Sequence, residues 1–79
     1  MRIDKFLKVS RLIKRRTVAN EACAGGRVSV NGKTAKASCE VKVGDVVEIS
    51  MGQNHLKIRI IKLAETVMKE DAAAMYEII

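Results

Sequence analysis

Residues 22–32 read ACAGGRVSVNG, and this segment contains the change of period that decides the fold. Upstream of it, apolar residues recur at a helical spacing, whereas valines alternate with polar residues over residues 27–30, as in a half-buried strand. The Gly25-Gly26 pair is a natural end for a helix. The Asn31-Gly32 pair is typical of a two-residue turn between antiparallel strands. The segment therefore predicts a helix, its end, and the first strand of a hairpin.

Two short amphipathic helices are predicted before the glycines. The first has one buried stripe, made by Ile3, Phe6, Leu7 and Ser10. The second runs from about Lys14 to Ala24, and its apolar face is made by Val18, Ala19, Ala22 and Cys23. Because most of these side chains are small, we expect the second helix to approach its neighbour closely and to place Cys23 in the core.

The rest of the chain is predicted to form short strands and a small C-terminal element. We expect short strands on both sides of a turn at Gly44-Asp45. Residues 55–63 alternate between apolar and basic side chains, which predicts another strand, and residues 51–54 are its connecting turn. The tail is expected to form one or two helical turns over residues 70–75. Its last residues, 76–79, fit either a helix or an edge strand.

Helices that precede a run of strands indicate an α+β fold. We expect two N-terminal helices packed on a small antiparallel sheet, with a short C-terminal helical element. A chain of 79 residues is predicted to be a single domain, residues 1–79, with a core motif over residues 1–50 and extra strands and a tail over residues 51–79. One Phe, one Tyr and no Trp mean that the core is mainly aliphatic, which leaves little room for a substrate cavity.

The positive charge is concentrated in one half of the sequence. The net charge of the chain is +6. Residues 1–42 contain eleven Lys and Arg and three acidic residues, a net charge of +8. Residues 43–79 contain four Lys and Arg and six acidic residues, a net charge of −2. A local surplus of this kind suits a polyanion, usually nucleic acid and less often an anionic membrane. We expect a cytoplasmic protein, because no apolar stretch of a secretory signal follows the N-terminus and no run is long enough to span a membrane.

The sequence offers little for catalysis or metal binding. Cys23, Cys39 and His55 make a poor metal set, and we expect two reduced thiols rather than a disulfide. There is no phosphate-binding loop of the GxxxxGK[ST] or GxGxxG type, and no serine has a base at a signature spacing. We therefore expect a binding module that is not an enzyme and has no cofactor.

The most basic segment is RIDKFLKVSRLIKRR, residues 2–16, in which seven of fifteen residues are Lys or Arg and only Asp4 opposes them. It is either an ordinary solvated helix face or a clamp for backbone phosphates, whose neutralisation releases counterions. The clamp is favoured because cations at the start of a helix, here residues 14–16, are unfavourable unless an anion binds there.

The nucleic acid is predicted to be folded RNA. Aromatic side chains that would stack on single-stranded bases are missing. The second helix also lacks the polar ladder with which a DNA-binding helix reads base edges, so a DNA-binding repressor is the less favoured alternative. The composition suits recognition of RNA shape and phosphates.

Three residues of the basic segment are given specific roles. Asp4 is expected to hold a nearby cation in position, with Lys8 and Arg11 as the candidates. Arg2 and Arg16, at the starts of the two helices, are expected to grip phosphates. As exposed charges, these two arginines should contribute little to folding stability.

The ordered set RxDxFL, Ser10-Arg11, a helix that ends in GG, VxVNG and VxxGD resembles the S-four RNA-binding domain over residues 1 to about 50. In that family the two helices and the following hairpin form an L-shaped RNA-binding motif. The resemblance implies RNA contacts in the helices and around the hairpin. With the charge pattern, it gives a predicted RNA-binding set of Arg2, Lys5, Lys8, Arg11, Lys14, Arg15, Arg16, Arg27, Asn31, Lys33 and Lys36, with Asp4 as the orienting residue.

Within the family, RIDKFLKVSRLIKRRTVA and KEDAAAMYEII resemble the stand-alone ribosome-associated quality control protein P group (RqcP). That resemblance implies binding to the large ribosomal subunit, to its ribosomal RNA and to peptidyl-tRNA, in support of an RqcH-type partner that adds alanine tails to stalled nascent chains. Two alternatives stay open. One is a ribosome-recycling factor like the small heat-shock relative, which carries a longer basic C-terminal extension, and the other is a ribosome-assembly or translation-control factor.

If the basic segment neutralises about four to six phosphates, binding to large subunits should weaken steeply with salt. The expected slope of log affinity against log salt is about −0.7 to −0.9 for each phosphate contact. Co-sedimentation with purified subunits over a salt series measures it. An affinity that barely depends on salt would show that the positive charge does not carry binding.

Overall fold

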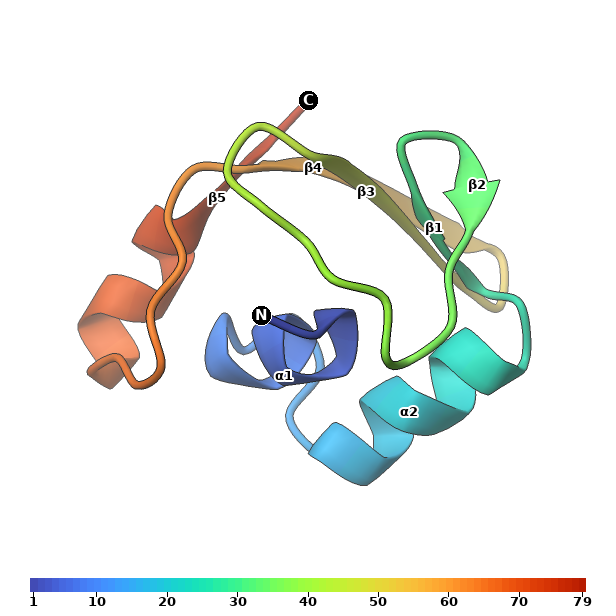
Figure 1. Ribbon diagram of the computed structural model, residues 1–79, viewed down its shortest axis with the longest axis horizontal. Helices are drawn as coiled ribbons and strands as arrows, with labels where there is room; N and C mark the ends of the chain where they lie inside the picture. Colours follow the sequence, from blue (N-terminus) through green and yellow to red (C-terminus); the bar gives the residue numbers. More distant parts are fainter.

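The computed structural model describes all 79 residues and is an α+β fold, as predicted (Figure 1). One five-stranded antiparallel sheet has the strand order β2-β1-β3-β4-β5. The two N-terminal helices lie against one face of this sheet. In chain order, the elements are α1 (Ile3–Val9), α2 (Arg16–Ala24), β1 (Val28–Val30), β2 (Lys33–Thr34), β3 (Val46–Met51), β4 (Asn54–Ile60), the 3-10 helix η1 (Lys69–Met75) and β5 (Tyr76–Ile78).

The core lies between α1 and the sheet. The apolar stripe predicted for α1 is confirmed, since Ile3, Phe6 and Leu7 are fully buried. Phe6 is the largest fully buried side chain of the molecule. It belongs to one cluster with side chains of the two central strands, which are Val47, Ile49, Ile58 and Ile60. Helix α1 therefore supplies the apolar face that closes the sheet.

Helix α2 differs from the prediction at its start and on one side. It begins at Arg16 rather than Lys14, because the preceding Arg15 has an extended backbone. Ala19, Ala22 and Cys23 are buried as expected, but Val18 is 41% exposed. The three small residues at i, i+3 and i+4 already form the narrow stripe that packs inward, and Val18 falls outside it.

The glycine stop and the tight hairpin are confirmed. Gly26 adopts a left-handed backbone (φ 74°) directly after the helix cap Gly25, which is the conformation that ends helices. Asn31 and Gly32 both have positive φ, as a two-residue I′ turn requires. The Asn31 side chain also accepts a hydrogen bond from the Val46 backbone N–H at 2.9 Å, which fastens the hairpin to the start of β3.

The prediction of a strand before the Gly44-Asp45 turn is wrong. Residues 41–43 do not join the sheet, because the buried Asp45 carboxylate accepts the backbone N–H of Lys42 at 3.0 Å and the side-chain amide of Asn31 at 3.1 Å. These bonds hold a compact turn in place of an extended strand. The segment before it runs beside the N-terminus instead, where Val41 donates its N–H to the carbonyl of Met1.

The C-terminal half follows the sequence pattern. Strand β4 buries Ile58 and Ile60 and exposes Lys57 and Arg59, which alternate with them. The turn before it is shorter than the predicted residues 51–54, because Met51 and Asn54 already pair in the sheet. The tail forms η1, as expected, and then β5. Of the two structures that fit the last residues, a helix or an edge strand, the edge strand is the one that forms. None of the helices has the length and apolar character that crossing a membrane would require.

Phe6→Ala should remove the contact that joins α1 to the sheet and cost about 3–5 kcal/mol of the free energy of unfolding. Small domains have only about 5–15 kcal/mol in total, so the variant should be largely unfolded near physiological temperature. Urea unfolding followed by circular dichroism measures this. The exposed Val18→Ala is the control and should change stability by about 0.5 kcal/mol or less. A Phe6→Ala variant as stable as this control would place the core elsewhere.

Candidate nucleic-acid interface

A buried carboxylate joins the starts of the two helices. Asp4 is 2% exposed and lies in the first turn of α1. Its Oδ2 atom lies 3.2 Å from Nη2 of Arg2 and 3.4 Å from Nε of Arg16. The backbone N–H of Lys5 donates to Oδ1 at 2.8 Å, and Nη2 of Arg16 lies 3.4 Å from the same atom. Asp4 therefore connects α1 to the first residue of α2.

The partners predicted for Asp4 are wrong. Lys8 and Arg11 lie at the other end of α1, where they line a different cleft. The Asp4 carboxylate instead faces the start of α2, and the cations it contacts are Arg2 and Arg16. Spacing along one helix predicts an i, i+4 neighbour, but the contact that forms is a tertiary one.

These contacts change the pKa of Asp4. Burial alone would raise the pKa of this carboxyl, but the hydrogen bond and charge of Arg16, the charge of Arg2 and the Lys5 N–H together outweigh it. The pKa of Asp4 is consequently lowered from the ordinary value of 3.8. The carboxylate is thus ionised at neutral pH and can hold both guanidinium groups.

Arg2 and Arg16 each bury part of the side chain and leave the rest in solvent, with 45% and 47% of the side chain exposed. A guanidinium has five N–H donors, and Asp4 uses only some of them. The two arginines line an open hollow of about 500 Å³ with Thr17, Asn20 and Glu21. The structure brings them together at the helix starts, as a phosphate grip requires. Because Arg16 also balances a buried charge, we expect it to contribute more to stability than an ordinary exposed arginine.

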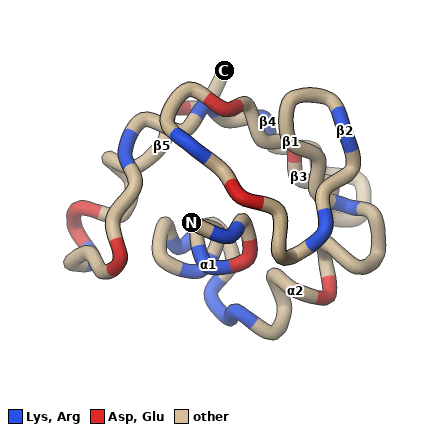
Figure 2. Tube along the Cα trace, viewed as in Figure 1, with Lys and Arg blue, Asp and Glu red and all other residues tan.

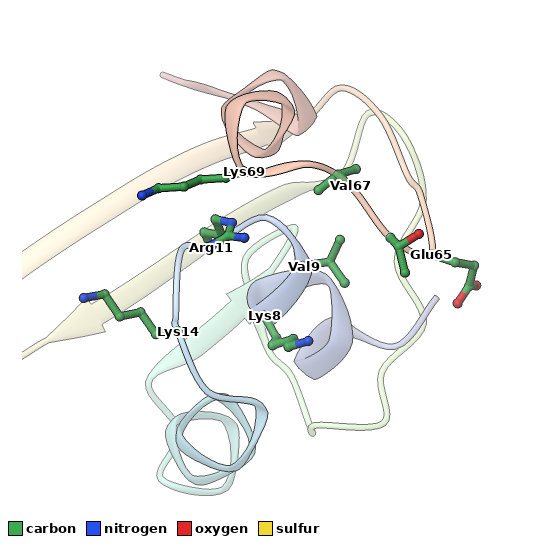
Figure 3. A pocket seen from close by; sticks show the side chains of 8 residues that line it. Lys8, Val9, Arg11, Lys14, Glu65, Val67 and Lys69 are labelled. Atoms are coloured by element: carbon green, nitrogen blue, oxygen red, sulfur yellow. The ribbon is translucent and has the colours of Figure 1, made fainter.

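A second group of predicted residues lies at the opposite end of α1 (Figure 3). Lys8, Arg11 and Lys14 line a cleft of about 620 Å³, whose other wall is the segment from Glu65 to Lys69. Lys69, which also lines this cleft, is not among the residues predicted from the sequence. It lies in the half of the chain with a net negative charge, and no local spacing links it to the basic segment.

Lys5 is partly engaged within the protein. Its ammonium group forms an ion pair with Glu65, which joins α1 to the C-terminal segment. The hydrogen bond and charge of Lys5 lower the pKa of the exposed Glu65 carboxyl. Lys5 therefore helps to position the wall of the cleft.

The remaining predicted residues flank α2 or lie on and after the hairpin, where Figure 2 shows the basic positions along the chain. Arg15, Arg27, Lys33 and Lys36 are all exposed, and their RNA contacts stay predictions. Asn31 has both polar atoms of its side chain engaged, with Val46 and Asp45. Its structural role is clear.

The other face of the sheet has its charges paired. Lys57 on β4 lies 3.8 Å from Glu48 on β3, and Arg59 lies 2.6 Å from Glu77 on β5. Ser50 and His55, directly opposite one another, are joined at 3.0 Å. Neighbouring acids thus offset the cations on this face, whereas most of those on α1 and the segment after it have none. Compared with this face, the helical side therefore carries an excess of positive charge.

Comparison with known proteins identifies the domain. The model of the S4 domain family matches residues 1–47, which include both helices and the hairpin. This chain belongs to the S4 domain family.

Full-length relatives are similar beyond that domain. A protein of Streptococcus pneumoniae named RQC P-site tRNA stabilizing factor is 54% identical over 79 residues, covering 100% of this chain and 90% of its own length. A protein of Bacillus subtilis with the same name is 53% identical, covering 100% and 92%. Among solved structures, trimeric heat shock protein 15 of Vibrio cholerae superposes with a TM-score of 0.92 at 30% identity, covering 100% of this chain and 81% of that one.

Asp4→Asn should change the pH dependence of stability. Because the pKa of Asp4 is lower in the folded protein than the ordinary 3.8, its ionised form stabilises the fold fully above that value. The contribution is lost as the pH falls through the folded pKa. The parent should therefore exceed the variant in stability above about pH 5, and the difference should shrink towards about pH 2. Urea unfolding over this range measures it, and a difference independent of pH would contradict the assignment.

Proposed function

We propose that this protein binds the large ribosomal subunit in ribosome-associated quality control, with ribosomal RNA and peptidyl-tRNA as its RNA partners. The observation that carries the proposal is the pair of arginines held by the buried Asp4 at the start of both helices. The proposal is supported by membership of the S4 domain family and by similarity over the full chain to proteins named as P-site tRNA stabilizing factors.

The arginine pair suits phosphate binding for a physical reason. A flexible arginine loses side-chain freedom when it binds, whereas Arg2 and Arg16 are already restrained by Asp4. Each guanidinium can still present N–H donors to a phosphate in a bidentate arrangement. Release of counterions from the RNA then drives association. The proposed role is binding without catalysis.

The proposed partner is an RqcH-type factor that adds alanine tails to nascent chains on obstructed subunits, and the proposed location is the cytoplasm. In this role the protein would steady the RNA while the partner acts. We further propose that residues 1–79 act as one unit. The ribosome-recycling alternative is less well supported, because the heat shock protein 15 structure is 30% identical to this chain, against 54% for the Streptococcus pneumoniae protein.

Substitutions at Arg16 test the proposal. Arg16→Ala should sharply reduce co-sedimentation with large subunits that carry peptidyl-tRNA, and Arg16→Lys should restore only part of it, because a lysine is a point charge without the planar fork. Arg16→Ala should also lower stability, by an amount on the order of 1–3 kcal/mol, because Asp4 loses a partner. Binding is therefore compared at a temperature at which melting curves show every variant to be folded.

Arg59→Ala is the matched control for Arg16→Ala. Arg59 has a similar side-chain exposure, 46% against 47%, and is also paired with an acid, but it lies on the opposite face of the sheet. Its replacement should leave ribosome binding unchanged. Equal losses for the two alanine variants would mean that net charge alone governs binding, and no loss for Arg16→Ala would refute the proposal.

A further inference from the structure

The cleft at the C-terminal end of α1 is a second concentration of positive charge. Its basic residues come from three separate parts of the chain, since Lys8 belongs to α1, Arg11 and Lys14 to the connection between the helices, and Lys69 to the start of η1. Figure 3 shows Lys14 and Lys69 extending in the same direction, with Arg11 between them in this view. The cleft shares no lining residue with the hollow at Arg2 and Arg16.

The four cations of this cleft are not neutralised within the protein. None of the molecule's ion pairs includes Lys8, Arg11, Lys14 or Lys69. The one acid in the lining, Glu65, is already paired with Lys5, which does not line the cleft. Like charges gathered in this way repel one another. An anionic ligand would relieve that repulsion.

The backbone at Arg11 gives a second, independent indication. Arg11 directly follows the cap residue of α1 and has φ of 64°, in the left-handed region. Glycine is the usual residue at this position of a helix end, because the side chain of an ordinary L-residue makes the left-handed backbone unfavourable. Asn31, the other such residue, is a type that tolerates this backbone in turns. The Arg11 side chain makes no hydrogen bond or ion pair within the protein, so no contact of its guanidinium explains why an arginine stands at this strained position, which points to a role outside the fold.

We propose that this cleft binds phosphates of an RNA backbone, as a contact separate from the one at Arg2 and Arg16. The inference rests on the proposed RNA-binding function and extends it to a site that residues 1–47, which match the S4 domain, cannot complete. Lys69 and the wall from Glu65 to Val67 come from the C-terminal segment. Basic side chains on both walls suit a chain of phosphates running through an open cleft, and Lys14 connects the cleft along the sequence to Arg16.

Arg11→Gly and Lys69→Ala test this inference. Arg11→Gly removes the guanidinium and relieves the backbone strain, so its thermal midpoint should be equal to or above that of the parent. Each variant should bind large subunits more weakly, and each should make the slope of log affinity against log salt shallower by about 0.7–0.9. Co-sedimentation with purified large subunits over a salt series measures both quantities.

Lys62→Ala is the control for Lys69→Ala. It removes the same charge from the same C-terminal segment, but Lys62 does not line the cleft. Its affinity and salt slope should match those of the parent. If Arg11→Gly and Lys69→Ala also match the parent while Arg16→Ala loses binding, the cleft inference is wrong and the proposed function stands. If the parent itself shows no salt-dependent binding, the proposed function fails first.

Discussion

The ionised carboxylate of Asp4 is the constraint on which the interface depends. A buried charge is tolerated only where partners replace the water it has lost. Here Arg2, Arg16 and the Lys5 N–H provide that replacement, and two of the three come from outside α1. The buried carboxylate thus ties the start of α2 to the start of α1 and holds two half-exposed guanidinium groups close together.

The rest of the fold separates apolar packing from charge. The stripe of α1 closes one face of the sheet over an aliphatic core, with Phe6 as its largest member. On the opposite face, basic residues of β4 are paired with acids of β3 and β5. The helical side keeps an excess of positive charge, because two arginines share the single carboxylate of Asp4 at the start of α1 and the cations at its other end have no acidic partner. This small chain can therefore have a strongly basic surface on one side while the charges on the other side are balanced.

Much of the fold could be predicted because its signals are local. The glycine stop, the Asn31-Gly32 turn, the stripe of α1 and the alternation of β4 all depend on residues close together in the chain. The strand expected at residues 41–43 was wrong because the buried Asp45 holds a turn there, through bonds that include one to the distant Asn31. Local spacing similarly predicted the wrong partners for Asp4 and did not indicate Lys69. The contact of Asp4 with Arg16 and the position of Lys69 in the cleft both depend on how distant segments of the chain fold together.

The most direct measurement compares Asp4→Asn with Glu21→Gln in binding to large ribosomal subunits. Both residues line the hollow that contains Arg2 and Arg16, and both changes raise the net charge by one. Binding is measured by co-sedimentation at a temperature at which both variants are folded. If Asp4 positions the arginines, Asp4→Asn should bind more weakly than the parent, and Glu21→Gln should bind as well or more tightly. Tighter binding by Asp4→Asn, equal to that of Glu21→Gln, would show that Asp4 only repels phosphate and that the arginine pair needs no buried anchor.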